Sequence, residues 1–437
     1  MSLLKELKEK NAIHDCSNFD ELSKFLEENK TCFYCGFDPT ADSLHVGSLL
    51  PLIIMRKLQL KGHFPIILIG TATGMIGDPS GKSEERVLLT QEIVHKNAES
   101  ISNQVGKIVD LSDAKIINNH TRIEKIKMID FLRDLGKHFS VNSMIAKESV
   151  KERLNNREQG ISFTEFSYML LQSYDFYWLN QNHDCQLQIG GSDQWGNITA
   201  GLELIRKKQS EKNRSKDSNE DKKEETPAFG FTFPLLKTAS GTKFGKTEAG
   251  AIWLDKNKTS AYNFYQFWLN SSDDDLENFF NLFSFKEKEE IADILEMHRK
   301  NPEKRIAQKE LAQELTKLLH GEEETLSAVS ASDVLFNKNI KEASSSDLMV
   351  IFKDVPHVSI KKSELKSELN NLQEILVKAG AAKSNSEARR KVEAGSIYLN
   401  DEKQSDFKKE ITSEDFIEGK VLIIRSGKKN YYLVKLK

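Results

Sequence analysis

The first half of the chain alternates between short apolar runs and helical segments. The runs CFYCGF (32–37), FPIILIG (64–70) and CQLQIGG (185–191) predict three strands, and LLPLIIMRKLQLKG (49–62) predicts a helix between the first two. Strands that alternate with helices are typical of a parallel sheet covered on both faces. The pattern therefore predicts an α/β fold, with a Rossmann-like domain over residues 1–230 and a helical insertion at about 90–180.

The second half is predicted to hold a helical domain and a small α+β module. The composition turns helical over 261–337, where four leucines form one stripe just before His320-Gly321: Leu311, Leu315, Leu318 and Leu319. We expect 231–260 to connect the first two domains and 338–363 to be a linker. In the module at 364–437, SNSEARRKVEAG predicts a helix with Ser384 as its cap and Glu387 three residues later, before the strand SIYLN.

A polar run at 207–227, KKQSEKNRSKDSNEDKKEETP, interrupts the first domain. It contains no large aliphatic or aromatic residue, so it has too little apolar surface to offset the entropy of ordering. We expect a mobile surface loop. The alternative is a lysine-rich arm that binds RNA. The interleaved Glu and Asp residues disfavour this alternative.

Composition and charge narrow the function classes. The 437 residues suggest several domains, and the 4 cysteines, at 16, 32, 35 and 185, favour neither a disulfide framework nor a metal site. The amino terminus lacks a signal-type apolar segment and no later apolar run approaches membrane-spanning length, so we expect a cytoplasmic protein.

The net charge is −3, yet residues 371–437 hold 14 Lys and Arg against 10 Asp and Glu. The carboxyl end is therefore the basic part of an acidic chain. Its predicted helix carries Arg389, Arg390 and Lys391, which suits contacts to an RNA backbone. An ordinary solvated surface is the alternative.

The stretch GMIGDPSGKS (74–83) resembles a phosphate-binding P-loop. That loop needs its first glycine five residues before the glycine of Gly-Lys-Ser, which here is the position of Ile76. Gly77 is one residue too close and Gly74 two too far. The spacing disfavours a P-loop, and the role of Lys82 has to be sought elsewhere.

Two other segments carry candidate phosphate chemistry. In YCGFDPTADSLHVGSLL (34–50) a strand runs into a helix start, whose free N–H groups favour phosphate binding. In GTKFGKTEAG (241–250) two lysines lie in a glycine-flanked loop. Each segment is weak evidence by itself. In this order, with a parallel-sheet pattern between them, they resemble the two signatures of class I aminoacyl-tRNA synthetases.

Five segments in order sharpen the resemblance to bacterial-type tyrosyl-tRNA synthetases. They are YCGFDPTADSLHVGS, GDPSGKSEER, FSYMLLQSYDF, GGSDQWGNI and KFGKT. The likeness covers nearly the whole chain, including a last module similar to an RNA-binding fold first seen in a ribosomal protein. One departure is Ser48, where the first signature commonly ends in His or Asn; its hydroxyl can still donate to ATP.

The resemblance implies roles for residues that surround the ATP phosphates. Lys82 and Arg86 would lie on a mobile loop over the pyrophosphate. The candidate catalytic residues are Thr40, His45, Lys82, Arg86, Lys243 and Lys246. The candidate ATP-binding residues are Asp38, Gly47, Ser48, Gly191, Asp193, Lys243, Lys246 and Thr247, with Gly191 and Asp193 at the ribose.

The amino-acid pocket depends partly on helical spacing. Tyr168, Gln172 and Asp175 stand at i, i+4 and i+7, so they share one helix face. Without the resemblance, a polar stripe of this kind predicts a helix face exposed to solvent. The resemblance instead implies that the stripe belongs to a tyrosine site. Its candidate residues are Tyr34, Asp78, Tyr168, Gln172, Asp175, Gln188 and Gln194.

Within that site, Asp175 and Tyr34 would bind the substrate phenol, and Asp78, Tyr168 and Gln172 its amino-acid end. A site built around a hydroxyl leaves buried polar groups unpaired when phenylalanine enters, and tyrosyl-tRNA synthetases are a known example.

The implied reaction joins L-tyrosine to tRNA(Tyr) through tyrosyl-adenylate, with ATP as substrate and Mg²⁺ held mainly by phosphate oxygens and water. The resemblance also implies a homodimer with contacts around 120–165. A tryptophanyl-tRNA synthetase and a non-catalytic RNA-binding protein on the same scaffold are the alternatives.

Overall fold

The computed structural model describes most of the chain in two compact units. The described residues are 2–80, 89–155, 160–214, 227–239, 241, 244–247, 250–337, 340, 343–345, 348–349, 352, 355–365, 367, 369–427 and 430–437. The first unit comprises Met1–Asp255 with Ser271–Leu311, and the second comprises Lys256–Asn270 with Ala312–Lys437.

A five-stranded parallel sheet forms the centre of the first unit, in the order β3-β2-β1-β4-β5. Its strands are β1 (Cys32–Phe37), β2 (Phe64–Ile69), β3 (Lys115–Asn118), β4 (Cys185–Gly191) and β5 (Phe229–Phe233). The chain leaves β1 toward β2 and β3 on one side, and β4 and β5 follow on the other side. The strand order thus reverses between β1 and β4, which is where open parallel sheets bind ligands, beyond the carboxyl ends of their strands.

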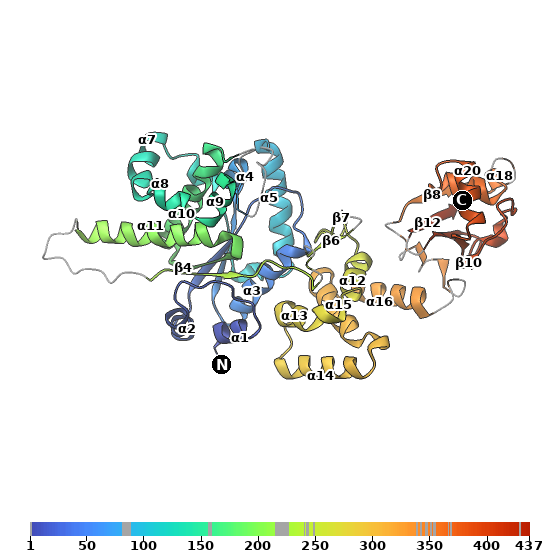
Figure 1. Cartoon of the computed structure of the whole chain (residues 1–437), viewed down its shortest axis with the longest axis horizontal. Coiled ribbons are helices and arrows are strands. Elements are labelled where there is room, and N and C mark those ends of the chain that lie inside the picture. The colour runs from blue at the N-terminus through green and yellow to red at the C-terminus, as the bar shows by residue number, and fades with distance from the viewer. Residues whose placement is uncertain are drawn as a thin grey trace. The chain divides into compact units, whose positions relative to one another are not determined.

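Helices cover both faces of this sheet (Figure 1). Those of the first unit are α1 (Leu3–Glu9), α2 (Phe19–Glu28), α3 (Leu49–Leu60), α4 (Thr71–Ile76), α5 (Gln91–Val105), α6 (His120–Ile123), α7 (Met128–Asp130), α8 (Val141–Ile145), α9 (Glu148–Asn155), α10 (Phe163–His183), α11 (Trp195–Arg214), α13 (Asp273–Phe283) and α14 (Lys288–Lys300). In addition, α15 (Ile306–His320) begins in this unit and ends in the second.

The long helix α10 carries the polar stripe predicted from the sequence. The Ser162 side chain caps it by accepting from the Glu165 N–H, and the helix ends at Asp184, whose φ is 48°. A buried ion pair fixes its first turn: the Arg153 guanidinium donates to both Glu165 carboxylate oxygens, at 3.1 and 2.8 Å.

The predicted α/β fold is confirmed, and the first domain differs from the prediction in two places. The insertion at 90–180 is not all helical, because β3 pairs with β2 at the sheet edge. A domain end at 230 would cut through β5. β3 (KIIN) has only two apolar residues, and in β5 (FGFTF) Gly230 and Thr232 interrupt the three Phe residues.

The polar run at 207–227 is not a loop over its first part. Helix α11 continues to Arg214, and residues 215–226 lie outside the described part of the chain. Contacts to the insertion support this polar extension: the Lys207 ammonium donates to the His138 carbonyl at 2.6 Å and the Lys208 ammonium to the Asp134 carbonyl at 2.8 Å. Composition alone could not reveal such contacts.

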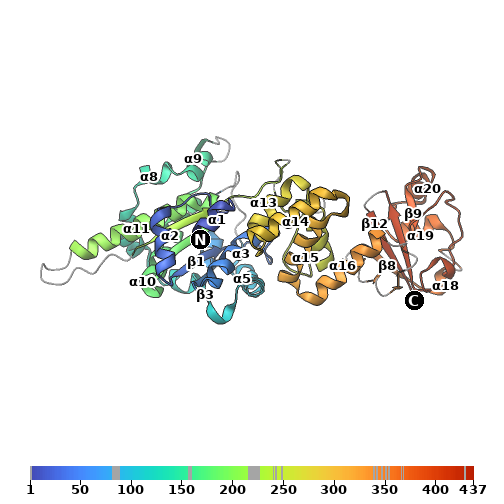
Figure 2. The ribbon, with the colours of Figure 1, turned by 90° about the horizontal axis from the view of Figure 1, so that it is seen from below.

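The second unit combines helices with a mixed five-stranded sheet, in the order β10-β9-β11-β12-β8 (Figure 2). Its strands are β8 (His357–Ile360), β9 (Ile397–Leu399), β10 (Glu402–Lys403), β11 (Val421–Ser426) and β12 (Asn430–Leu436). Its helices are α12 (Ala261–Leu269), α16 (Glu322–Asn337), α18 (Lys362–Leu365), α19 (Leu372–Lys378) and α20 (Asn385–Glu393), besides the end of α15. The predicted cap of α20 is present, since the Ser384 hydroxyl accepts from the Glu387 N–H at 3.3 Å.

The predicted linker at 338–363 belongs in part to this sheet. Strand β8 lies inside the range and pairs in parallel with β12. Four described residues of the range, Ile340, Ala343, Leu348 and Phe352, are buried in one cluster with β11 and β12. The predicted helical domain at 261–337 is divided as well, because residues 271–311 pack with the first unit.

Candidate active site

A cavity of about 710 Å³ opens at the carboxyl ends of β1 and β4. Most of the residues predicted from the sequence line it. They are Tyr34, Asp38, Thr40, His45, Gly47, Ser48, Asp78, Tyr168, Gln172, Asp175, Gln188, Gly191, Asp193 and Gln194. Residues from four separate sequence segments therefore meet at the point where the strand order reverses.

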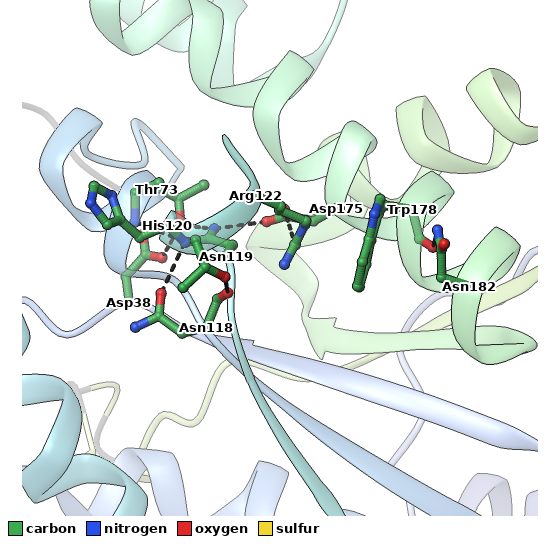
Figure 3. A network of polar contacts seen from close by, with 11 residues as sticks. Asp38, Thr73, Asn118, Asn119, His120, Arg122, Asp175, Trp178 and Asn182 are labelled. Carbon is green, nitrogen blue, oxygen red and sulfur yellow. Dashed lines mark hydrogen bonds and ion pairs between the residues drawn. The ribbon is translucent and has the colours of Figure 1, made fainter. Parts of the chain in front are cut away.

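One end of the cavity holds Tyr34 and Asp175, both only 1% exposed. Tyr34 projects from β1, and its ring lies 5.4 Å from that of Phe176. Asp175 projects from α10 and accepts from the Asn119 side-chain amide at 2.9 Å. Its other oxygen forms an ion pair with the Arg122 guanidinium (Figure 3).

Burial has the largest effect on the pKa values of Tyr34 and Asp175. It raises the pKa of the Tyr34 hydroxyl well above its usual range, and the nearby Asp175 carboxylate adds to that rise. Burial also raises the pKa of the Asp175 carboxyl, while Arg122 and Asn119 oppose the rise. Tyr34 is thus a neutral hydroxyl that can donate a hydrogen bond, next to a carboxylate that can accept one.

Two more carboxylates, those of Asp38 and Asp78, lie further along the cavity. The Tyr168 hydroxyl donates to Asp38 at 2.8 Å, and the Thr73 hydroxyl donates to the other Asp38 oxygen at 2.7 Å. Asp78 is buried and accepts from the Ser80 N–H at 2.9 Å and from the Gln194 amide at 2.6 Å. A buried and a half-buried aspartate in one cavity favour a cationic ligand group such as an ammonium.

Several buried polar atoms of the cavity have no hydrogen-bond partner in the described part of the chain. They are Tyr34 Oη, Ser80 Oγ, Gln172 Oε1 and Gln188 Oε1. Buried polar groups are normally hydrogen-bonded, so each exception needs an explanation. A polar ligand in this cavity would supply the missing partners.

The segment His45–Ser48, which the sequence predicts to bind phosphate, adopts a tight turn into α3. The His45 Nδ1 accepts from the Gly47 N–H at 3.0 Å and begins a short 3₁₀ helix, Val46–Ser48. A Cβ on Gly47 would lie 2.7 Å from the imidazole Cε1, so no other residue fits there without moving the ring. The absence of a side chain at Gly47 therefore leaves room for the His45 ring to pack against the helix start.

The second signature lies beside the first. Gly245 has a φ of +80°, and a Cβ there would lie 2.6 Å from Val46 Cγ1. The Val46 N–H donates to the Ile252 carbonyl at 2.8 Å, which ties the segment after β7 (Gly250–Ala251) to the helix start. The backbone of Lys246 and Thr247 forms β6, paired with β7. Lys82, Arg86 and Lys243 lie outside the described residues.

Sequence reasoning missed Asn119, Arg122 and Thr73. Asn119 and Arg122 follow β3, the edge strand that the apolar pattern did not reveal. The signal available in the sequence was the polar cluster NNHTR directly after KII, which a recognised strand would have placed at the cavity edge.

The predicted RNA-binding residues lie on α20. Arg389 forms an ion pair with Glu393 at 2.7 Å, and its guanidinium lies 4.7 Å from the Phe407 ring centre. Lys391 forms an ion pair with Glu387 and also donates to the Ala381 carbonyl at 2.8 Å. Arg390 is exposed and has no ion-pair partner within the described part of this module.

A parallel sheet with two glycine-containing signatures beside a cavity at its switch point fits a class I aminoacyl-tRNA synthetase. The family model described as "tRNA synthetases class I (W and Y)" matches residues 26–337, and the chain belongs to this family. A second model, "Tyrosine--tRNA ligase SYY-like C-terminal domain", matches residues 347–434.

Full-length relatives agree with this assignment. The chain is 48% identical over 440 residues to tyrosine–tRNA ligase 1 of Bacillus subtilis, covering 100% of both chains. It is 49% identical over 437 residues to tyrosine–tRNA ligase of Bacillus velezensis, covering 99% of each. It also resembles the crystal structure of a C-terminally truncated mitochondrial tyrosyl-tRNA synthetase of Aspergillus nidulans, with a TM-score of 0.68, 32% identity, and coverage of 77% of this chain and 94% of that one.

Proposed function

We propose that this chain is a tyrosine–tRNA ligase, which activates L-tyrosine with ATP and transfers the tyrosyl group to tRNA(Tyr). The observation that carries the proposal is the polar lining of the cavity. Tyr34 and Asp175 lie buried at one end, and the carboxylates of Asp38 and Asp78 lie further along. A phenol at one end of a ligand and an ammonium at the other match these groups.

The proposed pose gives partners to two of the unpartnered buried atoms, Tyr34 Oη and Gln172 Oε1. The substrate hydroxyl donates to Asp175 and accepts from Tyr34, while the ammonium binds Asp78, Tyr168 and the Gln172 carbonyl. Gln188 and Gln194 line the space between. A tryptophan side chain has no hydroxyl for Asp175 and Tyr34, so the same groups disfavour the tryptophanyl alternative.

ATP enters as its magnesium complex, with Mg²⁺ held by phosphate oxygens and water. The helix start at His45–Ser48 and Thr40 face the phosphates, and Gly191 with Asp193 receives the ribose, together with Asp38 and Thr247 as further ATP contacts. A Cβ on Gly191 would lie 2.5 Å from Asp193 Oδ1, so the glycine leaves this carboxylate room beside the ligand. Lys82, Arg86, Lys243 and Lys246 supply positive charge to the pyrophosphate.

The activation step needs no general base, because the tyrosine carboxylate is already ionised. One of its oxygens attacks the α-phosphorus of ATP; the bond to the bridging oxygen breaks, and pyrophosphate leaves. A ribose hydroxyl of the terminal tRNA adenosine then attacks the adenylate carbonyl. The bond from that carbonyl carbon to the phosphate oxygen breaks, AMP leaves, and the departing phosphate takes up the hydroxyl proton. Catalysis comes from positioning and from stabilising charge on the phosphates.

The basic helix α20 provides contacts to the tRNA backbone, chiefly through exposed Arg390, with Arg389 and Lys391 beside it. Free cysteines fit a reducing, cytoplasmic location. Within the described residues, no helix is long and apolar enough to cross a bilayer.

A second copy of the chain is the proposed partner of the insertion. Large apolar side chains are exposed there, including Met128 (74%), Ile129 (68%), Val141 (58%) and Phe163 (77%). Such a surface favours burial against another copy. Sedimentation of the purified protein should give twice the chain mass, and Phe163→Asp with Met128→Asp should give a monomer.

The proposed function is tested by aminoacylation with radiolabelled tyrosine. The purified protein, ATP, Mg²⁺ and bacterial tRNA should yield acid-precipitable tyrosyl-tRNA. Charging with tryptophan in place of tyrosine, or with neither amino acid, would overturn the proposal.

A further inference from the structure

Asp175 is a carboxylate in an unusual position for recognising a substrate. It is almost fully buried, and an ionised carboxylate is costly to bury unless a cation and further donors accompany it. A buried acid without them takes up a proton. Its acceptor strength toward a phenol therefore depends on its neighbours.

Arg122 supplies the positive charge that accompanies the buried Asp175 carboxylate. It lies on α6, directly after β3, and its side chain is 10% exposed. One terminal nitrogen forms the ion pair with Asp175, while Nε and Nη1 are buried with no hydrogen-bond partner in the described part of the chain. Asp175 is thus the hydrogen-bond acceptor that the structure assigns to this guanidinium.

Trp178 holds Arg122 in place from the other side. The guanidinium carbon lies 4.7 Å from the Trp178 ring centre, within the range of a cation–π contact. Trp178 stands three residues after Asp175 on α10, so both partners of Arg122 come from the same helix face (Figure 3). The Arg122 guanidinium therefore contacts both the Asp175 carboxylate and the Trp178 ring.

Asn119 fixes the second oxygen of Asp175. Its side-chain oxygen accepts from the Ala72 N–H at 2.8 Å, which orients the amide, and its nitrogen donates to Asp175 at 2.9 Å and to Thr73 at 3.1 Å. Arg122 and Asn119 therefore occupy different carboxylate oxygens. Each oxygen keeps a lone pair for the cavity, where Tyr34 and a ligand can use it.

We propose that Arg122 is a positioning residue for amino-acid selection, which keeps Asp175 ionised and oriented toward the substrate hydroxyl. Arg122 is not among the lining residues of the cavity, so it acts through Asp175. A hydrogen bond from a phenol to a carboxylate is stronger than one to a neutral acid. The charge of Arg122 therefore sets the preference for tyrosine over phenylalanine. This inference rests on the proposed tyrosine activation.

The test compares kcat/KM for tyrosine and for phenylalanine in ATP–pyrophosphate exchange. Arg122→Met keeps a long side chain beside Trp178 but removes the charge. It should lower kcat/KM for tyrosine about tenfold, mainly through KM, because the hydrogen bond loses its charged acceptor. Phenylalanine has no hydroxyl, so its kcat/KM should stay unchanged and the ratio should fall about tenfold. Arg122→Lys should retain most of the ratio.

Two controls separate positioning from a general structural role. Arg56→Met removes a half-buried arginine of α3 outside the cavity and should leave the ratio unchanged. In an Asp175→Asn background, Arg122→Met should cause no further loss of the ratio, since there is no charge left to hold.

Equal losses with both amino acids, or an unchanged ratio, would overturn the proposal. If Arg122→Met does not fold, Arg122→Gln gives the same comparison, with the same expected and contrary results. A wild-type protein without tyrosine-dependent exchange would instead contradict the proposed function, and that outcome is visible before any variant is made.

Discussion

Tyr34 on β1 and Gln188 on β4 are paired in register across the point where the strand order reverses, and each has a buried side-chain oxygen without a partner in the described part of the chain. The sheet itself thus presents two unsatisfied polar groups to the cavity. Folding an unsatisfied polar group into the interior costs free energy. A ligand that completes their hydrogen bonds recovers that cost, which makes the cavity selective for a ligand with polar groups at these positions.

The phenol-binding pair gives the first prediction. Tyr34→Phe should reduce discrimination between tyrosine and phenylalanine by about 1 kcal/mol, and Asp175→Asn by about 1.5–3 kcal/mol, because a hydrogen bond to a charged group is stronger. The ratio of kcat/KM values in pyrophosphate exchange measures both. Unchanged ratios in both variants would remove these residues from the pocket.

Gly47 gives the second prediction. Gly47→Ala should displace the His45 imidazole, because the new Cβ would lie 2.7 Å from it. Single-turnover adenylate formation should slow at least tenfold with little change in tyrosine affinity, since the phosphate side is disturbed and not the amino-acid side.

Gly196→Ala is the matched control for Gly47. Its Cβ would meet Lys147 at 3.6 Å, an ordinary contact, so the rate should stay near that of the wild type. A normal rate in Gly47→Ala would show that the close approach to His45 is not needed for the chemistry.

The buried ion pair at the start of α10 gives the third prediction. Arg153→Met should lower the free energy of unfolding by about 3–5 kcal/mol, because it leaves the buried Glu165 carboxylate unpaired. Chemical denaturation measures the change. Arg133→Met, which removes an exposed ion pair with Asp134, should change stability little. Equal effects of the two substitutions would contradict the structural role of the buried pair.

The basic helix α20 gives the fourth prediction. Arg390→Ala should weaken tRNA binding and reduce the salt dependence by roughly one phosphate contact, while pyrophosphate exchange continues. Lys391→Ala should act more through stability, because Lys391 donates to the Ala381 carbonyl. Filter binding at several salt concentrations distinguishes them. Unchanged tRNA binding in Arg390→Ala would mean that this face is only solvated.

The sheet type could be predicted because it depends on local patterns, and most of the site residues implied by the resemblance line the cavity. Apolar runs mark β1, β2 and β4, and the i, i+4, i+7 stripe on α10 brings Tyr168, Gln172 and Asp175 to one face. The resemblance assigned that face to a ligand. What lay within one element, or within a recognised segment, could be predicted.

Contacts between distant elements could not be predicted in this way. Edge strand β3 has a half-exposed polar pattern, so the position of Asn119 and Arg122 next to Asp175 was missed. The end of α11 is polar throughout and depends on partners such as His138 and Asp134. The core shared by Phe352 and Leu433 likewise hid the start of the terminal module. In each case tertiary contacts outweigh local composition.

ATP–pyrophosphate exchange of the wild-type protein tests most directly whether the cavity is built around the hydroxyl of tyrosine. Exchange should depend on the added amino acid, with kcat/KM for tyrosine far above that for phenylalanine, and with no measurable rate for tryptophan. Comparable rates with tyrosine and phenylalanine, or a preference for tryptophan, would contradict the account.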